Sequence, residues 1–377
     1  MEAEVEGEED AEDWPVVIID HGSGTCKAGL STDTKPTVVF PEVVGTPRRG
    51  EGDAAFGDAA YGQGNKFRIH HPVENGIIEN FELMELVWEH AMVTRLNVAP
   101  SDHAVLLTEP PYNPKPNRER MVEIMFETFQ VPYLNVSIQG VLALLGQGRT
   151  TGLVLDSGEG VTYTMPIFDG FGMPYCINRV DVAGRELNTL LAKLIAQEGP
   201  SLTTSEHQRH TRIMKEKHCY VALDPCSEFA DTVDYTLPDG TVVTLGDQRW
   251  KCPEAIFTPS LVGLESMGAA GLVWESISRC EIDLRKTLLS NVVLSGGSTM
   301  FTGFRERLTK ELRNFAPSAS QGHIRIAPSK EQDMAVWSGG QVFASLRDIQ
   351  GEQWMAIEDY EEYGANFIHD KIAVKYS

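Results

Sequence analysis

The chain has 377 residues and a formal net charge of −22, and 42% of its residues are hydrophobic and 8% aromatic. These values are typical of a globular protein with one large or two moderate domains. The acidic excess disfavours nucleic acid as a direct ligand, and no apolar run approaches the ~18 residues of a membrane helix.

The N-terminal segment and the cysteines bear on where the protein works. Residues 1–14 carry eight acidic side chains, which predicts a disordered acidic tail and no secretory signal. The six cysteines form no Cys-x-x-Cys pair, so we expect free, mostly buried thiols in a reducing compartment. We therefore expect a cytoplasmic protein with no membrane partner, and the nucleus is the alternative location.

Strand and helix patterns alternate through the first half of the chain. Residues 45–66 interrupt this order, because they are rich in Gly and Ala and predict a mobile excursion with little core of its own. The other expected elements are strands within 15–40 with a turn at Lys35-Pro36, a helix over 81–96, a strand over 104–108, a helix over 117–129 with Asn117 as its N-cap, and a helix over 137–146.

The second half repeats the alternation. Its hairpin signal, Leu237-Pro238-Asp239-Gly240-Thr241, predicts a tight turn between two strands. The other expected elements are strands over 152–156, 161–168 and 292–294, and helices over 184–196, 206–219, 303–315 and 335–347. Alternating strands and helices in both halves predict an α/β fold in which two similar domains face each other.

One motif occurs twice. Val16–Ile19 is a buried-strand pattern that runs into Asp20-His21-Gly22-Ser23-Gly24, and Gly152–Leu155 runs into Asp156-Ser157-Gly158-Glu159-Gly160. A third strand, over 292–294, stops at Ser295-Gly296-Gly297. Two strand-turn-strand units, each with a carboxylate and glycines at its turn, can hold a phosphate chain and its metal from opposite sides.

The residue types at these turns suit a nucleoside triphosphate. Glycines let backbone N–H groups approach phosphate oxygens, and Lys27, three residues past the first turn, can reach the phosphates. Asp20 and Asp156 are hard oxygen ligands that suit Mg²⁺ or Ca²⁺, held through water. The chain has no G-x-x-x-x-G-K-[ST] P-loop, and Lys27 stands where the dinucleotide fingerprint needs its third glycine. The histidines form no convincing set of metal ligands.

Long segments beyond the repeat resemble actin and the actin-related proteins, from about Val16 to Trp354. The segments that carry the resemblance are Asp20–Lys27, Leu107–Glu109, Asn113–Glu119, Ile124–Phe129, Gly148–Gly152, Lys215–Asp224, Leu237–Gly240, Cys252–Glu254, Ile282–Lys286 and Ser295–Met300. The resemblance implies an actin-like ATPase fold, with two similar α/β domains (four subdomains) around a nucleotide cleft. It assigns 15–146 plus 338–377 to the first domain, with a small subdomain at about 41–71, and 147–337 to the second, with a small subdomain at about 183–263.

Residue by residue, the resemblance also implies a site for ATP or ADP with Mg²⁺ or Ca²⁺. Asp20, Gln139 and Asp156 would organise the metal and its waters, and Gln139 would orient the attacking water. The phosphates would contact Gly22, Ser23, Gly24, Lys27, Gly158, Glu159 and Gly160. Adenosine would lie among Arg212, Lys215, Glu216, Gly296, Gly297, Ser298 and Met300.

Two departures from the family pattern concern hydrolysis. Glu159 stands where actin has an aspartate, and Tyr163 stands where actin has a histidine near the attacking water. A phenol with a pKa near 10 is a poor proton acceptor at pH 7. We therefore expect the nucleotide to bind while ATP hydrolysis is weak or slow, and the sequence leaves open whether the chain acts as an enzyme.

Two further departures concern assembly. The region from Gly45 to Pro72 is shorter than the actin loop that inserts into the next subunit, whereas Leu261–Ser276 stays apolar. A fixed subunit of a larger cytoskeletal complex is therefore favoured over a freely polymerising actin. The expected partners are other actin-like subunits, cytoskeletal complex proteins and actin-binding proteins. The alternatives are an actin-related subunit of a nuclear chromatin complex and, from a different class, a small-molecule kinase of the same fold.

Overall fold

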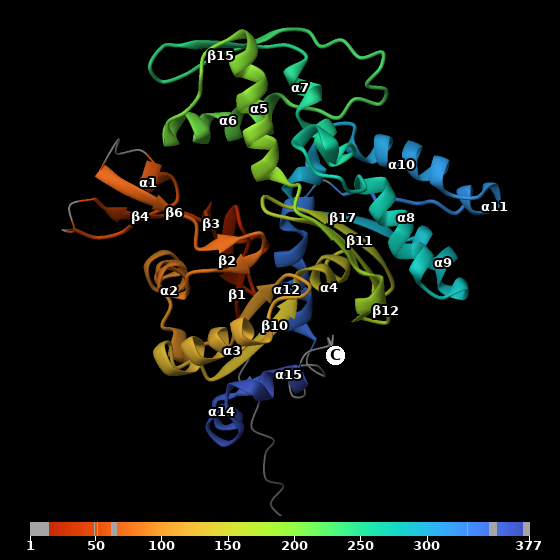
Figure 1. Cartoon of the computed structure of the whole chain (residues 1–377). Coiled ribbons are helices and arrows are strands. Elements are labelled where there is room, and N and C mark those ends of the chain that lie inside the picture. Colours follow the sequence, from red (N-terminus) through yellow and green to blue (C-terminus); the bar gives the residue numbers. More distant parts are fainter. Residues whose placement is uncertain are drawn as a thin grey trace, which may run out of the picture.

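A computed structural model describes residues 15–48, 50, 52–61, 66–329, 331–346 and 353–371 (Figure 1). The expected acidic tail, residues 1–14, lies outside the described residues. Two β-sheets with helices packed against them make an α/β fold, which confirms the expected fold class. The domain and subdomain boundaries drawn from the sequence stay predictions.

The first sheet has six strands in the order β18-β10-β9-β1-β2-β3. Strand β9 pairs in parallel with β1 and β10, and the remaining pairs are antiparallel. Strand β1 is buried along its whole length, as its unbroken apolar run predicts for a strand with both faces covered. The strands are β1 (Val17–His21), β2 (Thr25–Leu30), β3 (Val38–Pro41), β9 (Val105–Glu109), β10 (Tyr133–Ile138) and β18 (Met355–Ala356).

The second sheet has the order β13-β12-β11-β17, and β14 also pairs with β12. It is built like the first, because β11 forms an antiparallel hairpin with β12 and a parallel pair with β17, as β1 does with β2 and β9. The motif that is doubled in the sequence is therefore doubled in the structure. The strands are β11 (Gly152–Ser157), β12 (Thr162–Phe168), β13 (Phe171–Gly172), β14 (Asn178–Val180) and β17 (Val292–Ser295).

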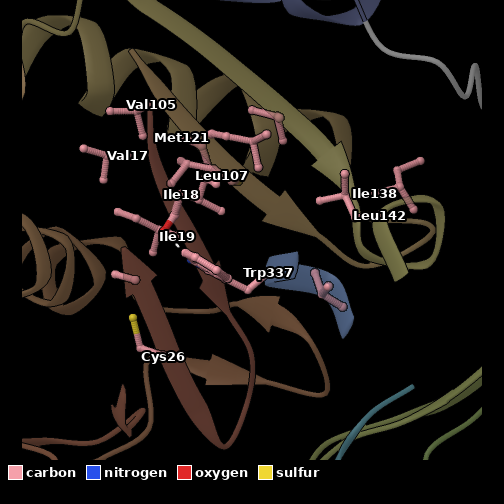
Figure 2. Close-up of a cluster of buried hydrophobic side chains, with 14 of the residues drawn as sticks. Val17, Ile18, Ile19, Cys26, Val105, Leu107, Met121, Ile138, Leu142 and Trp337 are labelled. Atoms are coloured by element: carbon pink, nitrogen blue, oxygen red, sulfur yellow. Dashed lines mark hydrogen bonds between the residues drawn. The ribbon is translucent and has the colours of Figure 1, made fainter. Parts of the chain in front are cut away.

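Helices α4 (Gln139–Leu145) and α12 (Ala335–Ser345) lie between the two sheets (Figure 1). Gly339 lets the two helices approach closely, because a Cβ there would lie 1.8 Å from the Leu142 carbonyl oxygen. Trp337 of α12 is fully buried among the side chains of Figure 2, and its Nε1 donates to the Ile18 carbonyl oxygen at 3.3 Å. One continuous core therefore joins the first sheet to one face of the second.

A second core lies on the other face of β11 and β17, against α5, α8 and α10. The helices outside the layer between the sheets are α1 (Asp58–Tyr61), α2 (Phe81–Glu89), α3 (Lys115–Glu123), α5 (Gly184–Glu198), α6 (Ser205–His218), α7 (Gln248–Lys251), α8 (Ala269–Arg279), α9 (Ile282–Leu289), α10 (Phe304–Phe315), α11 (Ser318–Gln321), α14 (Ile357–Tyr363) and α15 (Ile368–Lys371). Within the described ranges, every helix is too short or too polar to span a bilayer.

Several short elements complete the fold. Two α-helices continue as π-helices: α2 into η2 (His90–Leu96), and α3 into η4 (Ile124–Thr128). The expected hairpin is present as β15 (Val233–Thr236) and β16 (Val242–Leu245), and β7 (Val73–Glu74) pairs with β8 (Ile77–Ile78). The 3₁₀ turns are η3 (Pro100–Asp102), η5 (Pro174–Cys176), η6 (Pro253–Ile256), η7 (Pro259–Val262), η8 (Gly297–Met300), η9 (Gln332–Met334) and η10 (Ala365–Phe367).

The region expected to have little core of its own contains a small three-stranded sheet. Strand β4 (Val44–Pro47) pairs with β5 (Ala55–Phe56) and β6 (Phe67–His70), and Val44, Ala60 and Phe67 are buried. Phe56 also stacks on the His90 ring of η2 at 4.2 Å. Val44 and Phe67 lie just outside residues 45–66, and within the described part of that range only Gly45, Gly57 and Ala60 are buried. The burial pattern therefore agrees with the expectation of little core, although the small side chains let strand and helix pack closely.

Two predicted details in the first half were wrong. Helix α3 begins at Lys115 rather than after an Asn117 cap, because Pro116 is favourable in the first turn, and the Asn117 side chain instead donates to the Ile78 carbonyl oxygen at 2.9 Å. The segment read as a helix over 137–146 begins as strand β10 and becomes helical only at Gln139. The expected helices of the second half are all present, although the last residue of the helix expected over 335–347 lies outside the described residues. All six thiols are free, and all but that of Cys226 are buried, as expected.

Candidate functional site

The two glycine-containing turns face each other. Each turn closes its hairpin with a backbone hydrogen bond, from Gly22 to the Thr25 carbonyl oxygen at 3.3 Å and from Gly158 to that of Val161 at 3.1 Å. The turns meet where a Cβ on Gly160 would lie 2.4 Å from Ser23 Oγ, a distance that only glycine avoids. The Ser23 hydroxyl also accepts a hydrogen bond from the Gly76 amide at 2.8 Å.

A cavity of about 660 Å³ lies at these turns. Every residue that the sequence analysis selected for the site lines it: Asp20, Gly22, Ser23, Gly24, Lys27, Gln139, Asp156, Gly158, Glu159, Gly160, Arg212, Lys215, Glu216, Gly296, Gly297, Ser298 and Met300. The structure therefore brings together residues from five separate parts of the chain. Which ligand each of them contacts stays a prediction.

Two buried carboxylates lie in the cavity wall, one from each hairpin. Asp20 receives hydrogen bonds from Lys27 Nζ at 3.2 Å and from the Thr108 hydroxyl at 3.0 Å. Burial raises the pKa of Asp156 to about 6; the nearby Ser295 hydroxyl opposes this rise and the charge of Asp20 adds to it. The negative charge of Asp20 is thus balanced by Lys27. A positive charge placed in the cavity would stabilise the ionised form of Asp156.

Gln139 is oriented by the first hairpin. It is the first residue of α4, and its Nε2 donates to the His21 carbonyl oxygen at 3.2 Å and lies 3.3 Å from Thr108 Oγ1 and 3.4 Å from Asp20 Oδ1. Tyr163 lies nearby, because a Cβ on Gly140 would be 3.5 Å from its hydroxyl. Tyr163 is fully buried and is the strand partner of Asp156.

Glu159 is held by side chains from the second half of the chain. Asn188 Nδ2 donates to Glu159 Oε1 at 3.0 Å, and Lys215 Nζ lies 3.5 Å from Oε2. Space for the glutamate comes from Gly24 and Gly184, where an added Cβ would lie 2.6 Å and 2.2 Å from Glu159 atoms. The longer side chain therefore fits without separating the turns.

The predicted adenosine side is built from β17, the turn after it and α6. Gly296 has φ +84°, and an added Cβ there would lie 2.3 Å from the Ser157 carbonyl oxygen, so the turn requires glycine. The Ser298 hydroxyl donates to the Gly158 carbonyl oxygen at 2.8 Å. Arg212 donates to the Gly24 carbonyl oxygen at 3.1 Å and pairs with Glu216 at 2.8 Å. These contacts join the third strand and α6 to the two turns.

Sequence reasoning missed three residues that shape this site. Thr108 orients both Asp20 and Gln139, Gly76 donates to Ser23, and Asp333 lines the cavity. Thr108 could have been found, because it lies next to the end of a buried strand that is parallel to β1. Gly76 and Asp333 carry no local signal. Among the described residues, no three side chains of His, Cys, Asp or Glu gather as metal ligands.

Comparison with known families gives a match over almost the entire chain. A family model described as Actin matches residues 11–373. The match includes both hairpins, the helices between the sheets and every residue of the cavity wall described above.

Proposed function

The chain belongs to the actin family, and we propose that its cavity binds ATP or ADP together with Mg²⁺ or Ca²⁺. The observation that carries the proposal is the meeting of two glycine turns in one cavity of about 660 Å³, with Lys27 and two buried aspartates beside them. Backbone N–H groups and a lysine are the usual partners of a phosphate chain. Gly296, Gly297, Ser298 and Met300 then offer a separate wall for adenosine.

The donor set fits a divalent cation held through water. Asp20 and Asp156 supply hard oxygen atoms from opposite hairpins. Burial raises the pKa of Asp156 to about 6, and a cation would favour its ionised form. When bound, the cation would neutralise charge on the phosphates and orient them for transfer to water.

The arrangement supports nucleotide retention more than turnover. Gln139 is held close to Asp20, in a position to orient a water molecule. The side chain opposite Asp156 is the phenol of Tyr163, a poor proton acceptor at neutral pH. We therefore propose weak or slow ATP hydrolysis.

An exposed apolar segment supports a role in an assembly. Leu261, Leu264 and Met267 precede α8 and are 49%, 39% and 43% exposed, whereas Ala269, Ala270 and Val273 of the helix are buried. Neighbouring exposed apolar side chains favour contact with another protein. We propose that the protein serves in the cytoplasm as a subunit of a cytoskeletal assembly, with actin-like or other cytoskeletal proteins as partners. Nuclear chromatin complexes are the alternative setting.

Nucleotide binding is tested by titrating the full chain with ATP and magnesium in a calorimeter. Lys27→Met should weaken binding at least tenfold, because it removes a charge-assisted contact of about 1.5–3 kcal/mol. Lys286→Met, on the exposed face of α9, is the matched control and should bind as the wild type does. Lys27→Arg keeps the charge and should bind better than Lys27→Met. Equal affinities for Lys27→Met and Lys286→Met would contradict the proposal.

Sedimentation separates the proposed settings. In magnesium and salt, a freely polymerising protein pellets above a critical concentration, whereas a fixed complex subunit stays small and requires its partners. Leu264→Asp should weaken self-assembly or partner binding and leave nucleotide affinity unchanged. Transfer of phosphate from ATP to small sugars would instead indicate a kinase.

A further inference from the structure

The hairpin of β15 and β16 pairs with no other strand in the described part of the chain. It lies near α6 (Figure 1), and its buried side chains Leu237, Val243 and Leu245 belong to the second core. A two-stranded hairpin is marginally stable by itself, so its position depends on what packs against it. A tyrosine of β15 makes a further contact, with α6.

Tyr235 contacts two histidines of α6. Its hydroxyl lies 2.7 Å from His210 Nδ1, and the two ring centroids are 5.9 Å apart. The His218 ring meets the tyrosine ring edge to face, with centroids 6.1 Å apart. The two histidines are about two turns and about 12 Å apart along the helix. One ring can contact both of them only from a position between them.

His210 is poorly placed to carry a positive charge while the hairpin is docked. Its side chain is buried, and its Nε2 is buried with no hydrogen-bond partner among the described residues. Both ring nitrogens of an imidazolium are donors, so a charged His210 would need an acceptor at Nε2 as well. A buried donor without an acceptor is costly, and more so when it is charged.

The charges around His210 act in the same direction overall. Burial is the largest cause that lowers the pKa of His210, and the neighbouring Arg209 and His207 lower it further, against the opposing charge of Glu206. All three neighbours belong to α6. The docked hairpin therefore favours a neutral His210, whereas a solvated histidine takes up a proton with a pKa near 6.5.

His218 has a similar environment. Burial lowers its pKa, and the charges of Arg249 of α7 and Lys217 of α6 add to this effect. Arg249 Nε also donates to the His218 carbonyl oxygen at 2.8 Å. Asp234 and Asp239, the acidic residues of the hairpin, both accept hydrogen bonds from threonines of the hairpin itself. The tyrosine therefore lies between two imidazoles that are both neutral in the docked state.

We propose that Tyr235, His210 and His218 form a proton-sensitive latch, which holds the β15–β16 hairpin on α6 at neutral pH and weakens on acidification. The two histidines have lower pKa values when the hairpin is docked, so the open state binds more protons. The free energy of opening is thus full above about pH 6.5 and falls as the pH drops through that value. The apolar anchors of the hairpin remain, so acid increases a minor open population. The latch does not depend on nucleotide binding.

The test is hydrogen exchange of the full chain, followed by mass spectrometry at pH 7.5, 6.5 and 5.5 and corrected for the intrinsic effect of pH on exchange. Protection of residues 233–245 should fall about tenfold from pH 7.5 to pH 5.5, the effect of one histidine that is neutral when docked and charged when open. Helix α10 is the internal reference, and its protection should not change. An equal fall in both segments would indicate global unfolding and overturn the proposal.

A double variant identifies the groups that titrate. His210→Gln combined with His218→Gln removes both ionisable rings, so the protection of its hairpin should not vary with pH. His323→Gln, in the loop after α11, is the matched control and should behave as the wild type does. Hairpin protection that is the same at pH 7.5 and 5.5 in the wild type would overturn the proposal, whether or not the double variant folds. An equal fall in the double variant and the wild type would also overturn it.

Discussion

Tyr163 lies directly opposite Asp156 in the β11–β12 hairpin, as Lys27 lies opposite Asp20 in the β1–β2 hairpin. The two hairpins thus share their geometry and differ in chemistry at equivalent positions. Lys27 donates to its aspartate at 3.2 Å, whereas Tyr163 presents a phenol beside the helix that begins with Gln139. Under the proposed function, we expect this difference to favour nucleotide retention over hydrolysis.

Tyr163→His should speed ATP hydrolysis. A neutral imidazole, with a pKa near 6.5, accepts a proton far better at pH 7 than a phenol does, and general-base catalysis contributes about 10²–10⁴-fold. We expect at least a tenfold increase in the single-turnover rate. Tyr163→Phe, which also lacks a base, should hydrolyse as slowly as the wild type. A large loss of rate in Tyr163→Phe would show that the phenol itself takes part.

Gly160→Ala should destabilise the closed arrangement of the two turns. The added methyl group would lie 2.4 Å from Ser23 Oγ and 3.0 Å from Asn75 Cα, so the hairpins must separate. We expect a loss of about 1–3 kcal/mol in the free energy of unfolding without nucleotide, measured by urea titration. Gly158→Ala is the matched control, because its added Cβ has no neighbour within 4 Å. Equal losses in the two variants would contradict this account.

Glu42→Gln should change how stability depends on pH. Burial, followed by the charge of Asp20, raises the pKa of Glu42 to about 8, against smaller opposing effects of Lys27 and Cys26. In the unfolded chain the carboxyl ionises near pH 4.3. Between these values the folded state holds the extra proton, so the free energy of unfolding falls as pH rises, by at most about 1.4 kcal/mol per unit.

Glutamine does not ionise, so the Glu42→Gln variant does not lose stability in this way. The difference in free energy of unfolding, variant minus wild type, should therefore increase from pH 5 to pH 8 and then level off. Urea titrations at pH 5, 6.5, 8 and 9 measure the difference. Glu361→Gln, at an exposed position of α14, provides the control and should track the wild type. A difference that does not vary with pH would mean that Glu42 is ionised in the folded protein.

Arg118→Met should be strongly destabilising. Arg118 and Glu109 form an ion pair whose side chains are only 3% and 1% exposed, with Nη2 and Oε1 2.5 Å apart. Removing the cation leaves a buried carboxylate without its partner, which costs about 3–5 kcal/mol. Arg120→Met breaks the exposed pair with Glu123 and should cost less than about 1 kcal/mol. Urea titrations compare the two variants, and similar losses would refute the prediction.

The sequence predicted most elements of the fold because their signals are local. The apolar run before Asp20 and its copy before Asp156 indicate buried strands, and Asp239-Gly240 indicates a hairpin turn. Local signals gave a wrong prediction where a strand runs directly into a helix. Residues 137–146 contain the end of a strand and the start of a helix, and apolar spacing alone does not separate them.

By itself, the sequence determined the doubled hairpin, the α/β class and the residue types at the turns, because each depends on neighbours along the chain. Only the tertiary structure decided that Thr108 orients Asp20, that Glu42 is fully buried, and that Tyr235 contacts two histidines of α6. These relationships join segments far apart in the chain. They depend on how sheets and helices pack, and residue periodicity carries no record of that packing.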